Sequence, residues 1–134
     1  MIPQRILLQS FLSYRGTTEI DFSSISSAVI IGENGAGKSS ILDAITYALF
    51  GVARGTSKSG DNADRLITAG EEFCRVELDF QMEKRLYRVI RKRDLSKQTT
   101  ELELFMYDED QLNKNSNGKD KGDGLKILKI KGHQ

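Results

Sequence analysis

The apolar and polar positions near the N-terminus predict two strands and a buried run. Residues 5–11 and 17–22 read as strands joined by a turn at 12–16. After a serine-rich turn at 23–27 comes a short, continuous apolar run, residues 28–31. Such a run is typical of a strand that is covered on both faces, so we expect residues 28–31 to be buried in a sheet.

Residues 41–49 predict an amphipathic helix. Apolar side chains recur at spacings of three and four, which places them on one face packed on the sheet: Ile41, Leu42, Ala44, Ile45, Ala48 and Leu49. Gly51 follows as the expected C-cap. Asp43 lies on the more polar side, where a carboxylate in the N-terminal half of a helix suits the helix dipole. Residues 52–64 are rich in small polar residues and predict a mobile loop, and residues 63–69 are expected to hold a short helix.

From residue 74 on, apolar and polar residues alternate, which is the period of a strand with one buried face. Alternate apolar residues give one strand a single buried face: Cys74, Val76, Leu78, Phe80 and Met82. Residues 86–92 and 101–107 predict two more strands, the first of them reached through a tight turn at residues 83–84. Three amphipathic strands with short connections favour an antiparallel meander. The fold class is therefore α/β, with a mixed sheet around the helix and this meander beside it.

The C-terminal part of the chain has a different composition. Residues 108–124 are polar and of low complexity, which predicts a flexible segment after a domain of residues 1–107. Residues 125–130 are expected to form a last strand. Residues 125–134 as a whole are interpreted as a truncated end.

Length and composition exclude several classes of protein. The chain has 134 residues and a net charge of +1, so it reads as one domain whose bulk charge argues neither for nor against nucleic acid. Cys74 is the single cysteine, which rules out a disulfide within the chain and fits a reducing compartment. His133 is the single histidine, so an internal histidine metal site or catalytic triad is excluded. No apolar stretch is long enough to span a membrane, and a cytoplasmic location is expected.

The strongest chemical signal lies between the predicted buried strand and the helix. Residues 32–39 match G-x-x-x-x-G-K-[ST] in full, in the strand–turn–helix context of a phosphate-binding loop. Glycines let the backbone N–H groups approach phosphate, and the helix N-terminus favours negative charge. Lys38 is expected to reach the β- and γ-phosphates, and the Ser39 hydroxyl to complete a Mg²⁺ shell. The predicted ligands are ATP and Mg²⁺, held by Gly32, Asn34, Gly35, Ala36, Gly37, Lys38, Ser39 and Ser40.

The second half of a nucleotide-hydrolysing site is not evident. Such sites need an apolar strand that ends in an aspartate for the metal. Residues 104–107 followed by Asp108 have the residue types of such a motif. Their alternation, however, is that of a strand buried on one face only. We therefore interpret the match at Asp108 as coincidental and not as a metal-binding aspartate. We assign no catalytic residue within this chain.

A basic cluster covers the second strand of the meander. Its members are Lys84, Arg85, Arg88, Arg91, Lys92, Arg93 and Lys97, with Asp94 the only acid in the span. A solvated hairpin face is the favoured interpretation. The alternative is a DNA-backbone contact made by Arg88, Arg91, Lys92 and Arg93.

Several segments together resemble a known family. Residues 11–17 (FLSYRGT), the block 32–50, and residues 64–80 followed by 87–91 are similar to the N-terminal lobe of the SbcC-type exonuclease ATPases. These belong to the SMC-like group of ABC ATPases that act in DNA double-strand-break repair. The resemblance covers residues 4–107.

The resemblance implies a composite ATPase head. The C-terminal lobe of the same long chain, beyond an antiparallel coiled coil, would supply the signature motif, the metal-binding aspartate and the catalytic glutamate. ATP would clamp two heads into a homodimer that binds DNA and controls an SbcD-type nuclease near the nucleoid. Ser13 and the run Ile67, Thr68 and Ala69 would lie near the nucleotide. Leu12 departs from relatives that have arginine at this position.

Two other functions stay open. One is a self-sufficient small P-loop NTPase, such as a kinase or a GTPase-like switch, which would need Asp108 as its metal ligand. The other is a binding-only module that holds ATP and docks a partner without turnover, and this is the favoured state of the chain alone. ATP-driven clamping is favoured for the intact protein.

Overall fold

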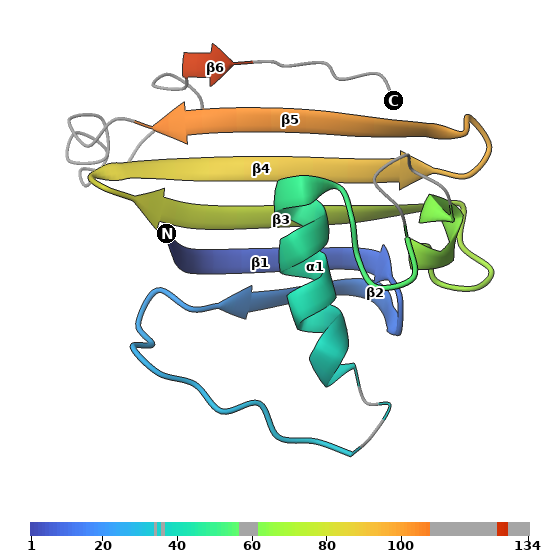
Figure 1. Ribbon diagram of the computed structural model, residues 1–134, viewed down its shortest axis with the longest axis horizontal. Helices are drawn as coiled ribbons and strands as arrows, with labels where there is room; N and C mark the ends of the chain where they lie inside the picture. The colour runs from blue at the N-terminus through green and yellow to red at the C-terminus, as the bar shows by residue number, and fades with distance from the viewer. Residues whose placement is uncertain (34, 36, 57–61, 108–125, 129–134) are drawn as a thin grey trace.

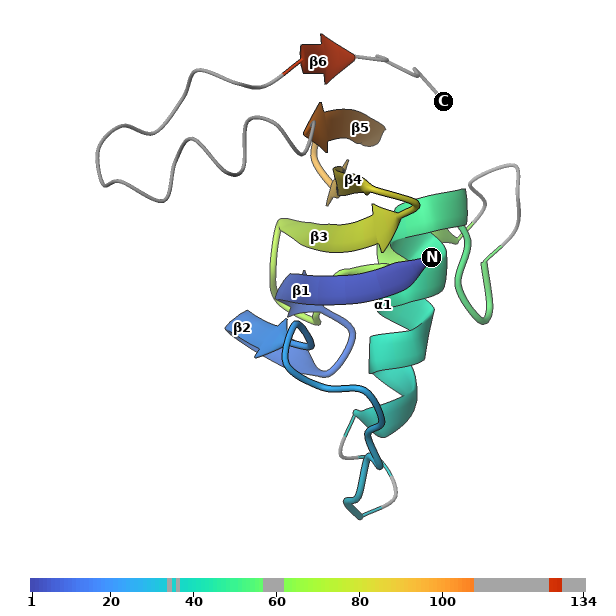
Figure 2. The same ribbon diagram turned by 90° about the vertical axis from the view of Figure 1, so that its left-hand side faces the viewer.

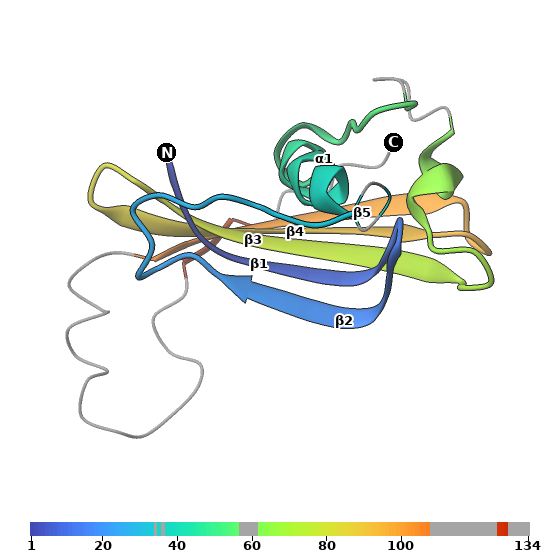
Figure 3. The same ribbon diagram turned by 90° about the horizontal axis from the view of Figure 1, so that it is seen from below.

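One sheet and one long helix make up most of the described chain. The computed structural model describes residues 1–33, 35, 37–56, 62–107 and 126–128. Its strands are paired in the order β2-β1-β3-β4-β5-β6, and α1 and the short 3-10 helix η1 lie on one face of the sheet (Figures 1 and 3). The bounds are β1 Ile2–Phe11, β2 Tyr14–Asp21, α1 Lys38–Phe50, η1 Ala63–Leu66, β3 Phe73–Met82, β4 Arg85–Asp94, β5 Thr99–Tyr107 and β6 Lys126–Leu128. No helix in this described part is long and apolar enough to cross a membrane.

The core lies between α1 and strands β1, β3 and β4. Alternate residues of β1 and β3 point toward the helix and are fully buried, among them Ile6, Leu8 and Leu78. Ala44 and Ala48, one turn apart on α1, have no exposed surface, and their small side chains let the helix approach the sheet closely. The apolar face predicted for residues 74–82 is therefore confirmed from Cys74 to Phe80, but the prediction is wrong for Met82, which is 46% exposed at the end of β3.

Tyr47 replaces Leu42 on the buried face of α1. Its ring stacks on Phe11 with 5.8 Å between centroids, whereas Leu42 is 63% exposed. The sequence pattern had assigned Leu42 to the core, and this was wrong because residues 42 and 47 lie on different sides of the helix. Burial also raises the pKa of the Tyr47 phenol.

The antiparallel meander is confirmed. The β3–β4 pairing runs without a break from Phe73 opposite Asp94 to Met82 opposite Arg85, and β4–β5 pairing continues it. Residues 83–84 form the predicted tight turn, with Glu83 at φ 57°. The last strand also exists, as β6 paired with β5. The predicted flexible segment, residues 108–124, lies outside the described residues.

The predicted buried strand at residues 28–31 is absent, and this is a correction. These residues form no strand, and Val29 and Ile31 are 85% and 89% exposed. In Figures 1 and 2 the chain between β2 and α1 runs apart from the sheet. All strand pairings among the described residues are antiparallel, so the sheet is not the mixed one expected. The reason is physical: a strand needs a neighbour for its N–H and C=O groups, and no described strand pairs with this run.

The first hairpin is tighter than predicted. Phe11 pairs with Tyr14 across a turn of Leu12 and Ser13, so β2 begins before Thr17. Leu12 and Ser10 adopt positive φ of 50° and 49°, and the β1–β2 register shifts between Gln9 and Phe11. This irregularity turns the end of β1 toward the loop that follows η1.

The C-terminus of α1 is held by an arginine from β4. Gly51 has φ +73°, and its N–H donates to the Tyr47 carbonyl at 2.8 Å, which confirms the predicted C-cap. The Arg91 guanidinium donates to the Ala48 carbonyl at 3.2 and 3.3 Å and lies over the Tyr47 ring. Burial lowers the pKa of Arg91, and the carbonyl and the ring compensate part of the desolvation.

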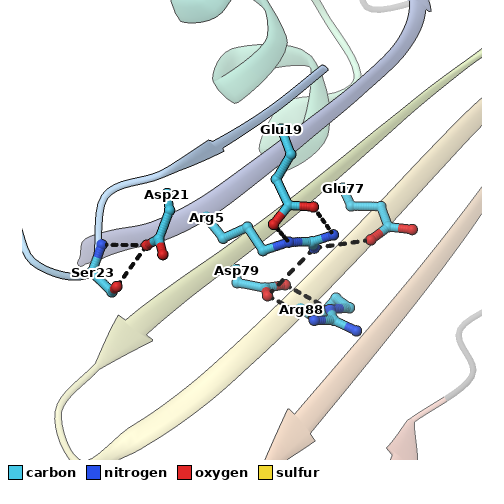
Figure 4. Close-up of polar contacts among 7 residues, drawn as sticks. All are labelled: Arg5, Glu19, Asp21, Ser23, Glu77, Asp79 and Arg88. Atoms are coloured by element: carbon cyan, nitrogen blue, oxygen red, sulfur yellow. Dashed lines mark hydrogen bonds and ion pairs between the residues drawn. The ribbon is translucent and has the colours of Figure 1, made fainter. Parts of the chain in front are cut away.

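The opposite face of the sheet is polar. Arg5 bridges Glu19 at 3.0 Å and Glu77 at 3.2 Å, and Arg88 binds Asp79 at 2.6 Å (Figure 4). The hydrogen bond from Arg5 lowers the pKa of Glu19. Because charges are paired across neighbouring strands, this face is stable in contact with water.

Replacement of Gly51 tests the contact at the end of α1. An alanine Cβ at Gly51 would lie 3.0 Å from Arg91 Nη1, whereas Gly55 has a similar φ of +79° with nothing within 4 Å of its Cβ. Both substitutions carry the left-handed backbone cost, and only Gly51→Ala also disturbs Arg91. We expect the free energy of unfolding to fall by about 1–2 kcal/mol for Gly55→Ala and by about 1 kcal/mol more for Gly51→Ala. Urea unfolding measures both, and equal losses would contradict the role of Arg91.

Candidate nucleotide-binding site

A pocket of about 660 Å³ lies at the N-terminus of α1. It brings together the β1–β2 turn, the phosphate-loop region, the first turns of α1 and the segment around η1. Its lining residues are Leu12, Ser13, Gly35, Gly37, Lys38, Ser39, Ser40, Asp43, Arg54, Arg65, Ile67 and Ala69.

Gly37 sets the start of the helix. It is the N-cap of α1 with φ 96°, and no side chain caps the helix there. The Tyr14 hydroxyl donates to the Gly37 carbonyl at 3.1 Å. A Cβ on Gly37 would lie 2.7 Å from Ser13 Oγ, so only glycine permits this close approach to the hairpin turn. The N–H of Ser40 donates to the Gly37 carbonyl at 3.1 Å, which leaves the N–H groups of Lys38 and Ser39 for an anion in the pocket.

The side chains of the loop are suited to a nucleotide and its metal. Lys38 Nζ donates to the carbonyl of Gly32, which is a neutral acceptor that a phosphate oxygen can replace. Ser39 follows at the second helical position, and its hydroxyl oxygen is the type of ligand that Mg²⁺ prefers. The described residues contain no cluster of acids and histidines that would hold a metal without phosphate. Asn34 and Ala36 lie outside the described residues.

Hydrogen bonds between β1 and the segment after η1 build a second part of the pocket wall. Leu12 N–H donates to the Leu66 carbonyl at 2.8 Å, and Thr68 N–H donates to the Ser10 carbonyl at 2.9 Å. The Thr68 hydroxyl donates to the Leu12 carbonyl at 2.8 Å. Residues 56 positions apart are therefore joined directly beside the loop.

These bonds decide where the residues predicted to flank the nucleotide lie. Ser13, Ile67 and Ala69 line the pocket. Thr68 is buried behind the wall and holds it to β1 through its hydroxyl. A contact between any of the four and a nucleotide stays a prediction.

Sequence reasoning missed three charged residues in the pocket. Asp43 is buried, and its carboxylate forms a two-pronged pair with Arg54, at 3.0 Å to Nε and 2.7 Å to Nη2. Asp43 follows Ser39 by four residues, and that spacing could have placed it on the pocket face of the helix. No sequence spacing predicts that Arg54 and Arg65 line the pocket, because only the tertiary path of their segments brings them there.

The four cations proposed for DNA do not form one surface. Successive residues of a strand point to opposite faces, so Arg91 and Arg93 face α1 and η1, whereas Arg88 and Lys92 face away. Arg91 and Arg93 are 8% and 9% exposed, and Arg93 Nε donates to Asp64 at 2.8 Å. Arg88 is paired with Asp79, as described above. The prediction that all four residues contact the DNA backbone through one surface is therefore wrong. Asp108 lies outside the described residues.

Comparisons with known proteins show which family the chain belongs to. The family model of the AAA domain matches residues 5–133. The chain is 36% identical over 110 residues to the SbcC subunit of the nuclease SbcCD of Deinococcus radiodurans, covering 82% of this chain and 12% of that protein. It is 45% identical over 91 residues to the DNA double-strand break repair Rad50 ATPase of Thermoplasma volcanium, covering 68% and 9%. The chain thus spans only a small part of these relatives.

A solved structure shows the same fold. It comes from work on the ATP-driven dimerization and DNA-stimulated activation of SMC ATPases, and it matches with a TM-score of 0.60 and 22% identity over 81% of this chain and 70% of that one. The α/β fold class and the suspected relationship are both confirmed. The chain belongs to the AAA domain family, and within it to the SbcC and Rad50-type ATPases, whose N-terminal lobe it represents.

Proposed function

We propose that this chain is the ATP- and Mg²⁺-binding lobe of a composite ATPase head. The observation that carries the proposal is the pocket at the uncapped N-terminus of α1, where Lys38 and Ser39 face a wall made by Ser13, Ile67 and Ala69. A helix N-terminus with a lysine and a hydroxyl is suited to a triphosphate with magnesium.

Each part of the pocket has a defined task in binding. The N–H groups of residues 32–40 would surround the phosphates, and Lys38 would exchange the Gly32 carbonyl for a phosphate oxygen. Ser39 would ligate Mg²⁺, which supplies charge neutralisation on the phosphates when bound. The wall residues would flank the nucleoside.

Hydrolysis needs groups from outside the described chain. Asp43 is the only carboxylate that lines the described pocket, and Arg54 neutralises it with two hydrogen bonds. We propose that this carboxylate holds Arg54 and does not act as the base that activates water. We therefore assign the catalytic glutamate and the metal-binding aspartate to the C-terminal lobe of the same protein.

The exposed apolar surface beside α1 suits that lobe. An apolar groove there is lined by Ile25, Ile30, Ile41 and Leu42, and it adjoins the exposed residues 28–31. Strands of the C-terminal lobe beside residues 28–31 would satisfy the backbone of this run and cover the groove. The run would then become the buried strand that its composition predicts.

In the intact protein we propose that ATP joins two such heads into a homodimer. The dimer would bind DNA and control an SbcD-type nuclease, with a coiled coil between the two lobes and a location in the cytoplasm near the nucleoid. The names of the relatives support a role in double-strand-break repair. A self-sufficient P-loop NTPase that uses Asp108 and a binding-only ATP module are the alternatives.

Substitution of Lys38 tests nucleotide binding. Lys38 is only half-buried in the described structure and its ammonium contacts a neutral carbonyl, so Lys38→Ala removes charge with little loss of packing. We expect the Kd for Mg-ATP, measured by calorimetry, to rise by about 100-fold or more, because hydrogen bonds to charged groups are lost at two phosphates. The matched control is Lys84→Ala, an exposed lysine in the β3–β4 turn. Unchanged affinity in Lys38→Ala would refute the phosphate-loop assignment.

Reconstitution tests the composite head. We expect no steady-state Mg-ATP hydrolysis by this chain alone and turnover when the C-terminal lobe of the same protein is added, because the base and the metal carboxylate arrive with that lobe. The measurement is phosphate release with and without the added lobe. Turnover by the chain alone that disappears in Asp108→Asn would establish the self-sufficient enzyme instead.

A further inference from the structure

Arg65 is an exposed cation in the wall of the nucleotide pocket. It lies in η1, a different segment of the pocket lining from the loop that carries Lys38. No hydrogen bond or ion pair joins its guanidinium to the described residues. An unpaired guanidinium at a pocket retains all of its donors for a ligand.

The backbone that presents Arg65 is held on both sides. Leu66 is 1% exposed and accepts a hydrogen bond from Leu12 N–H at 2.8 Å. Asp64 is bound by Arg93 Nε at 2.8 Å, which ties η1 to β4. Because its neighbours are fixed, the Arg65 side chain is presented to the pocket from a rigid base.

The charges in the pocket favour an anion beside Arg65. Its lining includes Lys38, Arg54 and Arg65, and the carboxylate of Asp43 compensates Arg54. Lys38 is bound only to a neutral carbonyl among the described residues. Two positive charges, one from α1 and one from η1, therefore remain without a compensating carboxylate in the described pocket.

We infer that Arg65, together with Lys38, binds the phosphate chain of the nucleotide. The inference rests on the proposed ATP-binding function and adds a residue to it. A guanidinium fork offers two parallel N–H groups to phosphate oxygens, so it fixes the orientation of the chain as well as adding charge. Arg65 is then a binding residue, and Asp64 with Arg93 positions it.

The test compares Arg65→Ala, Arg65→Lys and Lys84→Ala in this chain. Lys84 is a charge-matched control, because it lies in the β3–β4 turn at the opposite end of the sheet from η1 (Figure 1). We expect Arg65→Ala to raise the Kd for Mg-ATP by about 10- to 100-fold, Arg65→Lys by less, and Lys84→Ala not at all. The urea midpoint without nucleotide should be the same in all three.

Each other result has a distinct meaning. Failure of the unsubstituted chain to bind Mg-ATP would refute the proposed function itself. Binding by the unsubstituted chain with equal Kd values for Arg65→Ala and Lys84→Ala would overturn the inference alone. A lower urea midpoint in Arg65→Ala that accompanies weaker binding would also overturn it, because Arg65 would then act on the fold.

Discussion

The close packing of α1 on β1 and β3 is the contact on which the pocket depends. Ala44 and Ala48 place the helix directly on the sheet, and the Tyr47 ring stacks on Phe11 at the end of β1. Together these contacts aim the helix N-terminus at the β1–β2 turn. There the hairpin approaches so closely that Gly37 has no room for a Cβ. A core contact therefore determines where an anion can bind.

Two arginines of β4 extend this arrangement. Arg91 and Arg93 lie two residues apart on the helix-facing side of one strand, and each reaches a different element. Arg91 binds the last turn of α1, and Arg93 binds Asp64 in η1. One strand thus supports both α1 and η1, two elements that line the pocket. Buried arginines are costly unless paired, and here the carbonyl and carboxylate provide the compensation.

The run at residues 28–31 shows where local pattern and tertiary structure disagree. Its composition is that of a buried strand, yet Val29 and Ile31 are almost fully exposed. The hydrophobic character is a property of the residues, whereas burial requires a neighbouring strand. The chain spans 12% of the Deinococcus relative, so most of the candidate neighbours lie in the remainder of such a protein. The composite head that we propose would cover this exposed apolar run.

The sequence by itself determined the phosphate loop, the amphipathic helix, the meander and the family. These depend on short-range spacing, such as the residues from Gly32 to Ser39 and the alternation from Cys74 to Phe80. Only the tertiary structure decided that Arg91 and Arg93 are buried, that Thr68 stands behind the pocket wall, and that Asp43, Arg54 and Arg65 line it. The physical reason is range: hydrogen bonds such as that between Thr68 and Leu12 join residues far apart in sequence, and no local pattern encodes which distant segments meet.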